Sequence, residues 1–149
     1  MASPNALATL IELANKDAED AARHLGDTIR LREEATQKLE LLMQYRDDYA
    51  LRCQSDMANG ISATQFNNFQ VFMHKLDQAI AGQQQVVNDA GRRADQARTA
   101  WMACEQKKMS FVTLNDRADR AQALHERKRD QKQNDEYAAR SAQPKHPSH

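Results

Sequence analysis

Asp56-Met57-Ala58-Asn59-Gly60-Ile61-Ser62 is the one strong interruption in an otherwise helix-forming chain, so the path of the backbone depends on this segment. Asn59 and Gly60 tolerate positive φ and can end a helix. Ser62 and Gln65 have the spacing of a capping box, in which each side chain satisfies a backbone N–H at the start of a new helix. This stretch therefore predicts that one helix ends near residue 58 and that another begins near residue 63.

Proline marks the outer limits of both helices. All three prolines lie near the chain ends, and residues 5–143 contain none. Ser3-Pro4 has the pattern of an N-cap followed by proline at the first helical position. We therefore expect one domain over residues 1–140 and a disordered tail over 141–149. Within the domain we expect helix 1 at about 4–58, a turn at about 59–62 and helix 2 at about 63–138.

The composition favours long helices over a compact globular core. Of the 149 residues, 24 are alanine, and only 24 are leucine, isoleucine, valine or phenylalanine, which is too little bulk for a thick interior. A narrow contact line between two helices needs less apolar volume. The 21 basic residues balance the 21 acidic ones, so no global field points to nucleic acid or to an anionic membrane.

A repeat of small and apolar residues at alternating spacings of four and three runs through both predicted helices, which is typical of a coiled coil. Polar residues interrupt it at Thr28, Arg32, Arg46, Gln83 and Lys108. Because a short turn folds consecutive helices back on each other, the predicted fold is an all-α, antiparallel two-helix coiled-coil hairpin. The seam, meaning the contact line between the helices, should include Leu25, Leu39, Leu42, Leu76, Ile80 and Trp101.

A turn centred near Gly60 sets the register, pairing residue i with roughly residue 121 − i. Large residues then face small ones, with Trp101 near Ala18 and Leu39 beside Gly82. In the same register Cys53 and Cys104 lie about 50 Å apart by helical rise, so a disulfide within one monomer is impossible. Helix 2 outruns helix 1, and residues 118–138 should extend without an internal partner.

Five of the eight aromatic residues lie between positions 45 and 72. In the predicted register several of them share one side of the hairpin, half in the seam and half on its flank. Exposed grouped aromatics suggest a docking site, whereas extra packing near the turn is the plainer alternative. We define the aromatic patch as Leu42, Tyr45, Tyr49, Phe72, Leu76 and Ala79.

Basic residues cluster in the C-terminal part of helix 2, interleaved with acidic ones. Such a run is typical of a solvated helix face with ion pairs between residues four apart. A partner contact is the second interpretation, because an isolated helix is only marginally stable. Nucleic acid is less favoured, since acids alternate with the bases and no aromatic residue interleaves them. The basic set comprises Arg117, Arg120, Arg127, Lys128 and Arg129.

Catalysis has little support in the sequence. The five histidines are scattered, and neither a glycine-rich phosphate loop nor a nucleophile elbow is present. The two cysteines have no metal-ligand spacing, so we expect no cofactor and no metal. No stretch approaches the roughly 20 apolar residues of a membrane span, and no signal peptide is visible. A reduced cytoplasmic protein that is not an enzyme fits best.

Several motifs together resemble the flagellar FliJ family of bacterial type III export. They include Asp20-Ala21-Ala22-Arg23-x-Leu25-Gly26, Tyr45-x-x-x-Tyr49, the turn from Ser55 to Ile61, Asn68-Phe69-Gln70-x-Phe72 and Asp130-Gln131-Lys132. The resemblance spans nearly the whole chain. It implies an antiparallel coiled coil similar to the stalk helices of the rotary ATPase γ subunit. We expect the hairpin to be monomeric.

The family resemblance also implies partners. It implies contact between the open end of the hairpin, with the basic set, and the flagellar export ATPase with its regulator. It implies contact between the aromatic patch and the export-gate membrane protein, and it links the family to export chaperones. The protein would then be cytoplasmic and peripherally associated with the cell membrane at the flagellar base. Lys38 and Gln83 depart from the family's usual glutamine and histidine. A generic coiled-coil adaptor or dimerising rod is the alternative.

Overall fold

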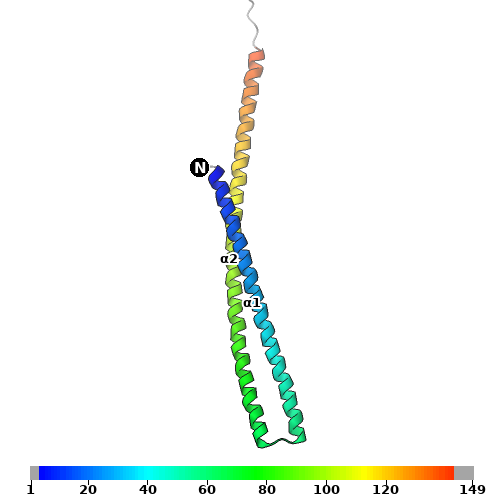
Figure 1. Ribbon diagram of the computed structural model, residues 1–149. Coiled ribbons are helices and arrows are strands. Elements are labelled where there is room, and N and C mark those ends of the chain that lie inside the picture. The colour runs from blue at the N-terminus through cyan, green and yellow to red at the C-terminus, as the bar shows by residue number, and fades with distance from the viewer. Residues whose placement is uncertain (1–3, 143–149) are drawn as a thin grey trace, which may run out of the picture. The chain divides into compact units, whose positions relative to one another are not determined.

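The computed structural model describes residues 4–142, which form two α-helices and no strand. Helix α1 covers Pro4–Asn59 and helix α2 covers Ala63–Ala142, with a three-residue turn between them (Figure 1). The two long helices pack against each other, so the predicted all-α helical hairpin is confirmed. α1 begins at the predicted proline and ends one residue later than expected.

The C-terminal limit of α2 differs from the prediction. Ser141 and Ala142, which we assigned to the disordered tail, are the last residues of α2, and the helix extends four residues past position 138. Alanine favours the helix there, and Pro144 disfavours helical backbone only at the residue before it. Two other predictions concern residues outside the described range. These are Ser3, the expected N-cap, and residues 143–149, the rest of the expected tail.

The turn has the local geometry that its residues predict. Gly60 adopts a positive φ of 86°, and its N–H donates to the Met57 carbonyl oxygen at 3.2 Å. The Ser62 hydroxyl accepts a hydrogen bond from the Gln65 N–H, and the Gln65 side-chain oxygen accepts one from the Ser62 N–H, both at 3.1 Å. The capping box is therefore confirmed, and it fixes the first turn of α2.

Contacts divide the chain into two compact units, Lys16–Glu105 and Met1–Asn15 with Gln106–His149. In the Lys16–Glu105 unit, α1 and α2 are antiparallel. The Gln83 amide donates to the Ala35 carbonyl oxygen at 3.0 Å, and the Tyr45 ring lies 6.3 Å from the Phe72 ring. Both pairs fall within about one helical turn of the predicted register.

Alanine dominates the contact line of the Lys16–Glu105 unit. Leu76 is the one large side chain that is buried there, whereas the other predicted seam residues, Leu25, Leu39, Leu42, Ile80 and Trp101, are only half-buried. A small side chain fits wholly between two close helices, but a large one projects past the single interface into water. The buried residues of this unit are Ala18, Thr28, Ala35, Leu76, Ala94 and Ala97.

One size match in the predicted register is wrong. We expected Gly82 to leave room for Leu39, yet a Cβ atom placed on Gly82 would meet nothing within 4 Å. The Gly82 position is exposed on α2, so the partner helix does not require a glycine there.

Two of the polar residues at predicted seam positions, Thr28 and Arg46, have hydrogen-bond partners. The buried Thr28 hydroxyl donates to the Leu25 carbonyl oxygen within its own helix at 2.8 Å. The Arg46 guanidinium of α1 binds Asp77 of α2 at 2.5 Å. The Thr28 hydroxyl and the Arg46 guanidinium are therefore both hydrogen-bonded, so these two interruptions of the repeat do not leave unsatisfied groups in the interface.

The other unit contains the N-terminal turns of α1 and the C-terminal part of α2. Here Ala14 is buried, and Leu7, Ile11, Phe111 and Val112 are half-buried. From residue 116 to residue 142 every side chain is exposed. The prediction that residues 118–138 form a helix without an internal partner is therefore confirmed for this unit.

Candidate interaction surfaces

Four aromatic rings gather in the Lys16–Glu105 unit on the turn side of Leu76. Tyr45 stacks on Tyr49 with ring centroids 6.5 Å apart, one turn along α1. Tyr49 reaches across to Phe72 at 4.6 Å and to Phe69 at 5.4 Å on α2. Tyr49 thus links the two helices, since it touches every other ring of the cluster.

Exposure varies across the aromatic patch. Tyr45 is 50% exposed, and Ala79 is also exposed. Tyr49, Phe72 and Leu42 are half-buried. Leu76 is only 7% exposed, so it packs between the two helices beneath the patch and is not accessible to a partner. The patch therefore has an accessible rim over a packed base, as we expected for residues that lie half in the seam.

One ion pair and the neutral Tyr49 hydroxyl determine the electrostatics near the ring cluster. The ion pair between Arg46 and Asp77 fixes the two helices beside it, and the Asp77 hydrogen bond raises the pKa of the Arg46 guanidinium. Partial burial raises the pKa of the Tyr49 hydroxyl above its usual value of about 10, so this ring is neutral at physiological pH. The surface beside Tyr45 is consequently apolar with one fixed ion pair at its edge.

The aromatic patch defined from the sequence does not include Phe69. The structure brings Phe69 against Tyr49, so it belongs to the same ring cluster. The spacing of three residues between Phe69 and Phe72 was the available signal, because residues three apart share a helix face.

The two positions that depart from the family pattern lie together. Lys38 is exposed and Gln83 is half-buried, and both line a groove with Leu31, Leu41 and Val86. Gln83 donates across the interface to the Ala35 carbonyl oxygen, so its amide joins α1 to α2.

The basic set lies on the exposed part of α2 in the second unit. All five residues are exposed. Arg127 donates to the Ala123 carbonyl oxygen at 3.5 Å, and the other four make no hydrogen bond or ion pair with residues in the described range 4–142. The expected ion pairs between residues four apart are not formed in this stretch. Its cationic groups are therefore accessible to a partner.

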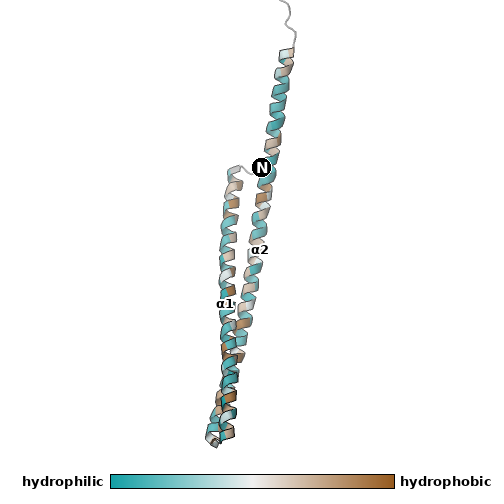
Figure 2. Ribbon diagram, turned by 90° about the vertical axis from the view of Figure 1, so that its right-hand side faces the viewer, coloured by the Kyte–Doolittle hydropathy of each residue, from teal (hydrophilic) through white to brown (hydrophobic). Residues whose placement is uncertain are grey.

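Other kinds of site find no support among the described residues. No group of three or more histidine, cysteine, aspartate or glutamate side chains in residues 4–142 is arranged to hold a metal ion. None of the described helices is apolar over a length that would cross a membrane. Figure 2 illustrates this, since hydrophobic residues occur in short stretches separated by hydrophilic ones along both helices.

The amino-acid sequence was compared with known proteins and with protein-family models. The family model described as "Flagellar FliJ protein" matches residues 3–146. The chain belongs to the flagellar FliJ protein family. It is 38% identical to the flagellar FliJ protein of Escherichia coli strain K12 over 145 residues, which cover 97% of this chain and 99% of that protein. It is 36% identical to the flagellar FliJ protein of Salmonella typhi over the same shares of both chains.

The matches extend over both helices and the turn. The family model includes the ring cluster and the basic set, so neither surface lies in a segment foreign to the family. The resemblance drawn from the sequence motifs is therefore confirmed.

Proposed function

We propose that this FliJ-family chain is a non-enzymatic component of flagellar protein export. In this proposal the aromatic patch binds the export-gate membrane protein, and the basic set on α2 binds the export ATPase and its regulator. Family membership supports the assignment to flagellar export. The observation that carries the gate contact is the exposure of Tyr45 over rings that are already packed.

The ring cluster has the physical properties of a protein-docking surface. Its rings are held by one another, so binding restricts few additional side-chain rotations. A partner that covers Tyr45 and the edge of Phe72 removes apolar area from water at low entropic cost. Aromatic residues at the centre of an interface commonly contribute about 2 kcal/mol or more each.

The exposed end of α2 supports the second contact by a different argument. A helix whose every side chain is exposed gains nothing from tertiary packing, and helices are marginal without it. A partner that encloses this segment would supply the missing contacts, and the unpaired cations would favour an acidic one. Association through these partners would hold the protein at the cytoplasmic face of the cell membrane at the flagellar base. Export chaperones remain a further partner class, with no residues assigned.

Removal of two rings tests the gate contact. We expect the Tyr45→Ala/Phe72→Ala double variant to remain helical by circular dichroism and to bind the cytoplasmic region of the gate at least about 30-fold more weakly. Its affinity for the ATPase should be unchanged. The matched control is Leu51→Ala/Val71→Ala, which removes two exposed apolar side chains elsewhere on the same helices and should bind both partners normally.

Charge reversal tests the ATPase contact in the opposite direction. Glutamate at Arg127, Lys128 and Arg129 should abolish ATPase binding and leave gate binding intact. Glutamate at Lys75, Arg93 and Arg98, which are exposed on the other unit, changes the net charge equally and serves as the control. If either triple variant or the ring variant loses both partners equally while folded, the assignment of separate surfaces is wrong.

A further inference from the structure

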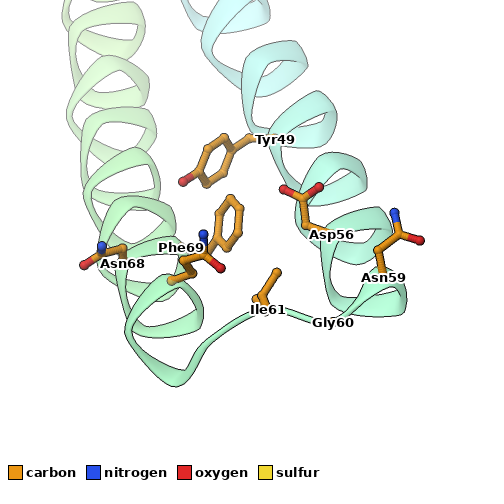
Figure 3. Close-up of a pocket in the computed structure, with 8 residues that line it drawn as sticks. Tyr49, Asp56, Asn59, Gly60, Ile61, Asn68 and Phe69 are labelled. Atoms are coloured by element: carbon orange, nitrogen blue, oxygen red, sulfur yellow. The ribbon is translucent and has the colours of Figure 1, made fainter.

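A pocket lies at the turn, where α1 ends and α2 begins (Figure 3). Its volume of about 400 Å³ is at the small end of the range for ligand pockets in proteins, enough for one long side chain. Tyr49 and Asp56 line it from α1, Asn68 and Phe69 line it from α2, and Ile61 closes it at the turn. The pocket belongs entirely to the Lys16–Glu105 unit.

Asp56 presents an unpaired carboxylate to this pocket. The side chain is half-buried, and it makes no hydrogen bond or ion pair with any residue between 4 and 142. Asp77, in contrast, is paired with Arg46 on the facing helix. Asp56 also lies in the last turn of α1, which contains no basic residue and whose carbonyl groups carry partial negative charge. At the start of α2 the Gln65 N–H donates to the Ser62 hydroxyl and the Phe66 N–H donates to the Ser62 carbonyl oxygen, and no basic residue lines the pocket. The pocket therefore lacks the cation that its charge favours.

The opposite side of the pocket is aromatic. Figure 3 shows the Asp56 carboxylate and the Phe69 ring facing the same space between the helices, with Tyr49 above Phe69. The Phe69 and Tyr49 centroids are 5.4 Å apart with their planes inclined by 61°. A planar guanidinium can donate to a carboxylate while its face covers an aromatic ring, which a compact ammonium group does less well. The combination selects arginine among the cationic side chains.

We propose that the turn pocket receives an arginine side chain of the protein that binds the aromatic patch. The guanidinium donates to the Asp56 carboxylate and stacks on Phe69. Tyr49 lies in both the patch and the pocket, so one bound segment can occupy the two sites without a gap. The identity of the arginine donor as the export gate rests on the proposed function, whereas the preference of the pocket for guanidinium does not.

A small-molecule titration tests the pocket itself. The full chain, labelled with ¹⁵N, is titrated with N-acetylarginine amide and, separately, with N-acetylcitrulline amide, which has nearly the same shape and no charge. We expect the arginine probe to shift the amide signals of Ile61, Asn68 and Phe69 with at least five-fold higher affinity than the citrulline probe. Asp56→Asn should abolish that preference, and Asp48→Asn, an exposed acid on the same helix, should retain it. Equal affinities for the two probes, or an unchanged preference in Asp56→Asn, would overturn the proposal.

A binding measurement with the gate separates this proposal from the proposed function. Asp56→Asn should weaken binding of the gate's cytoplasmic region about five- to ten-fold and reduce its salt dependence, while Asp48→Asn should not. If Tyr45→Ala weakens gate binding and Asp56→Asn does not, the arginine contact is wrong and the gate assignment stands. If neither variant changes gate binding while the guanidinium preference is observed, the gate assignment fails and the pocket serves another partner. Removal of an acid from the last turn of a helix is not expected to destabilise the fold.

Discussion

Gly60 is the residue whose backbone conformation the hairpin requires, because φ is positive at no other described residue. A side chain at Gly60 would meet no neighbouring atom within 4 Å, so the cost of replacing this glycine comes from backbone strain alone. Gly82 is the opposite case, since it lies within α2 with open space around it.

The two glycines should therefore respond oppositely to the same substitution. Gly60→Ala should lower the free energy of unfolding by about 1–2 kcal/mol, because alanine in the left-handed region is strained. Gly82→Ala should raise it by about 0.5–1 kcal/mol, because alanine is the better helix former. Urea denaturation followed by circular dichroism measures both. If Gly82→Ala lowered the free energy of unfolding, the space around position 82 would not be open, in contradiction to the structure.

The contribution of a leucine to the free energy of unfolding depends on how much of its side chain the two helices bury. Leu76→Ala should cost about 2–3 kcal/mol, since this side chain is almost fully buried. Leu39→Ala should cost less, since part of the side chain remains in water. Leu41→Ala, at a position that is 65% exposed, is the control and should change stability by less than about 0.5 kcal/mol. Equal losses at Leu76 and Leu39 in chemical denaturation would contradict the burial pattern.

At the scale of the helices, close approach depends on alanine. Ala94 and Ala97 on α2 and Ala18 and Ala35 on α1 are buried because nothing larger separates the two backbones at these points. Stability in this part of the hairpin therefore comes from many small contacts at short range, with large residues covering the edges.

Enlarging one of these alanines should push the helices apart. We expect Ala97→Leu to lower the free energy of unfolding by about 1–3 kcal/mol, because the added volume has no space to occupy. Ala100→Leu, three residues further along α2 at an exposed position, gains no such clash and should be nearly neutral. Thermal unfolding of the two variants compares them directly. A neutral Ala97→Leu variant would show that the helices are not in close contact there.

Local chemistry explains why the helices and their turn were predictable. Asn59, Gly60 and the Ser62–Gln65 capping box act within a few residues, so their effect on the backbone can be deduced without knowledge of the fold. The approximate register followed from the antiparallel geometry, because a short turn leaves few alternatives.

Side-chain burial was less predictable because it depends on how closely the helices approach. The heptad pattern treats Leu39 and Ala35 as equivalent seam positions, yet Ala35 is buried and Leu39 is only half-buried. Similarly, the membership of Phe69 in the ring cluster depends on the direction in which Tyr49 reaches across the interface. These properties arise from both helices together and not from either sequence segment alone.

At the scale of the whole molecule, we propose that two kinds of surface bind two different partners. The ring cluster of the Lys16–Glu105 unit is apolar, preorganised and partly exposed, whereas the C-terminal part of α2 is cationic and fully exposed. Apolar aromatic surface and unpaired positive charge select different partner chemistries. Two contacts of this kind on one chain would let it connect a membrane-bound partner with an ATPase.

Site-specific photo-crosslinking in flagellated cells tests whether the ring cluster and the basic set contact different partners. The photoreactive residue p-benzoylphenylalanine is placed at Tyr45, at Arg127 or, as a control, at the exposed Leu51, and the captured proteins are identified by mass. We predict that position 45 captures the export-gate membrane protein, that position 127 captures the export ATPase or its regulator, and that position 51 captures neither. Capture of the same partner from positions 45 and 127, or no gate protein from position 45, would contradict it.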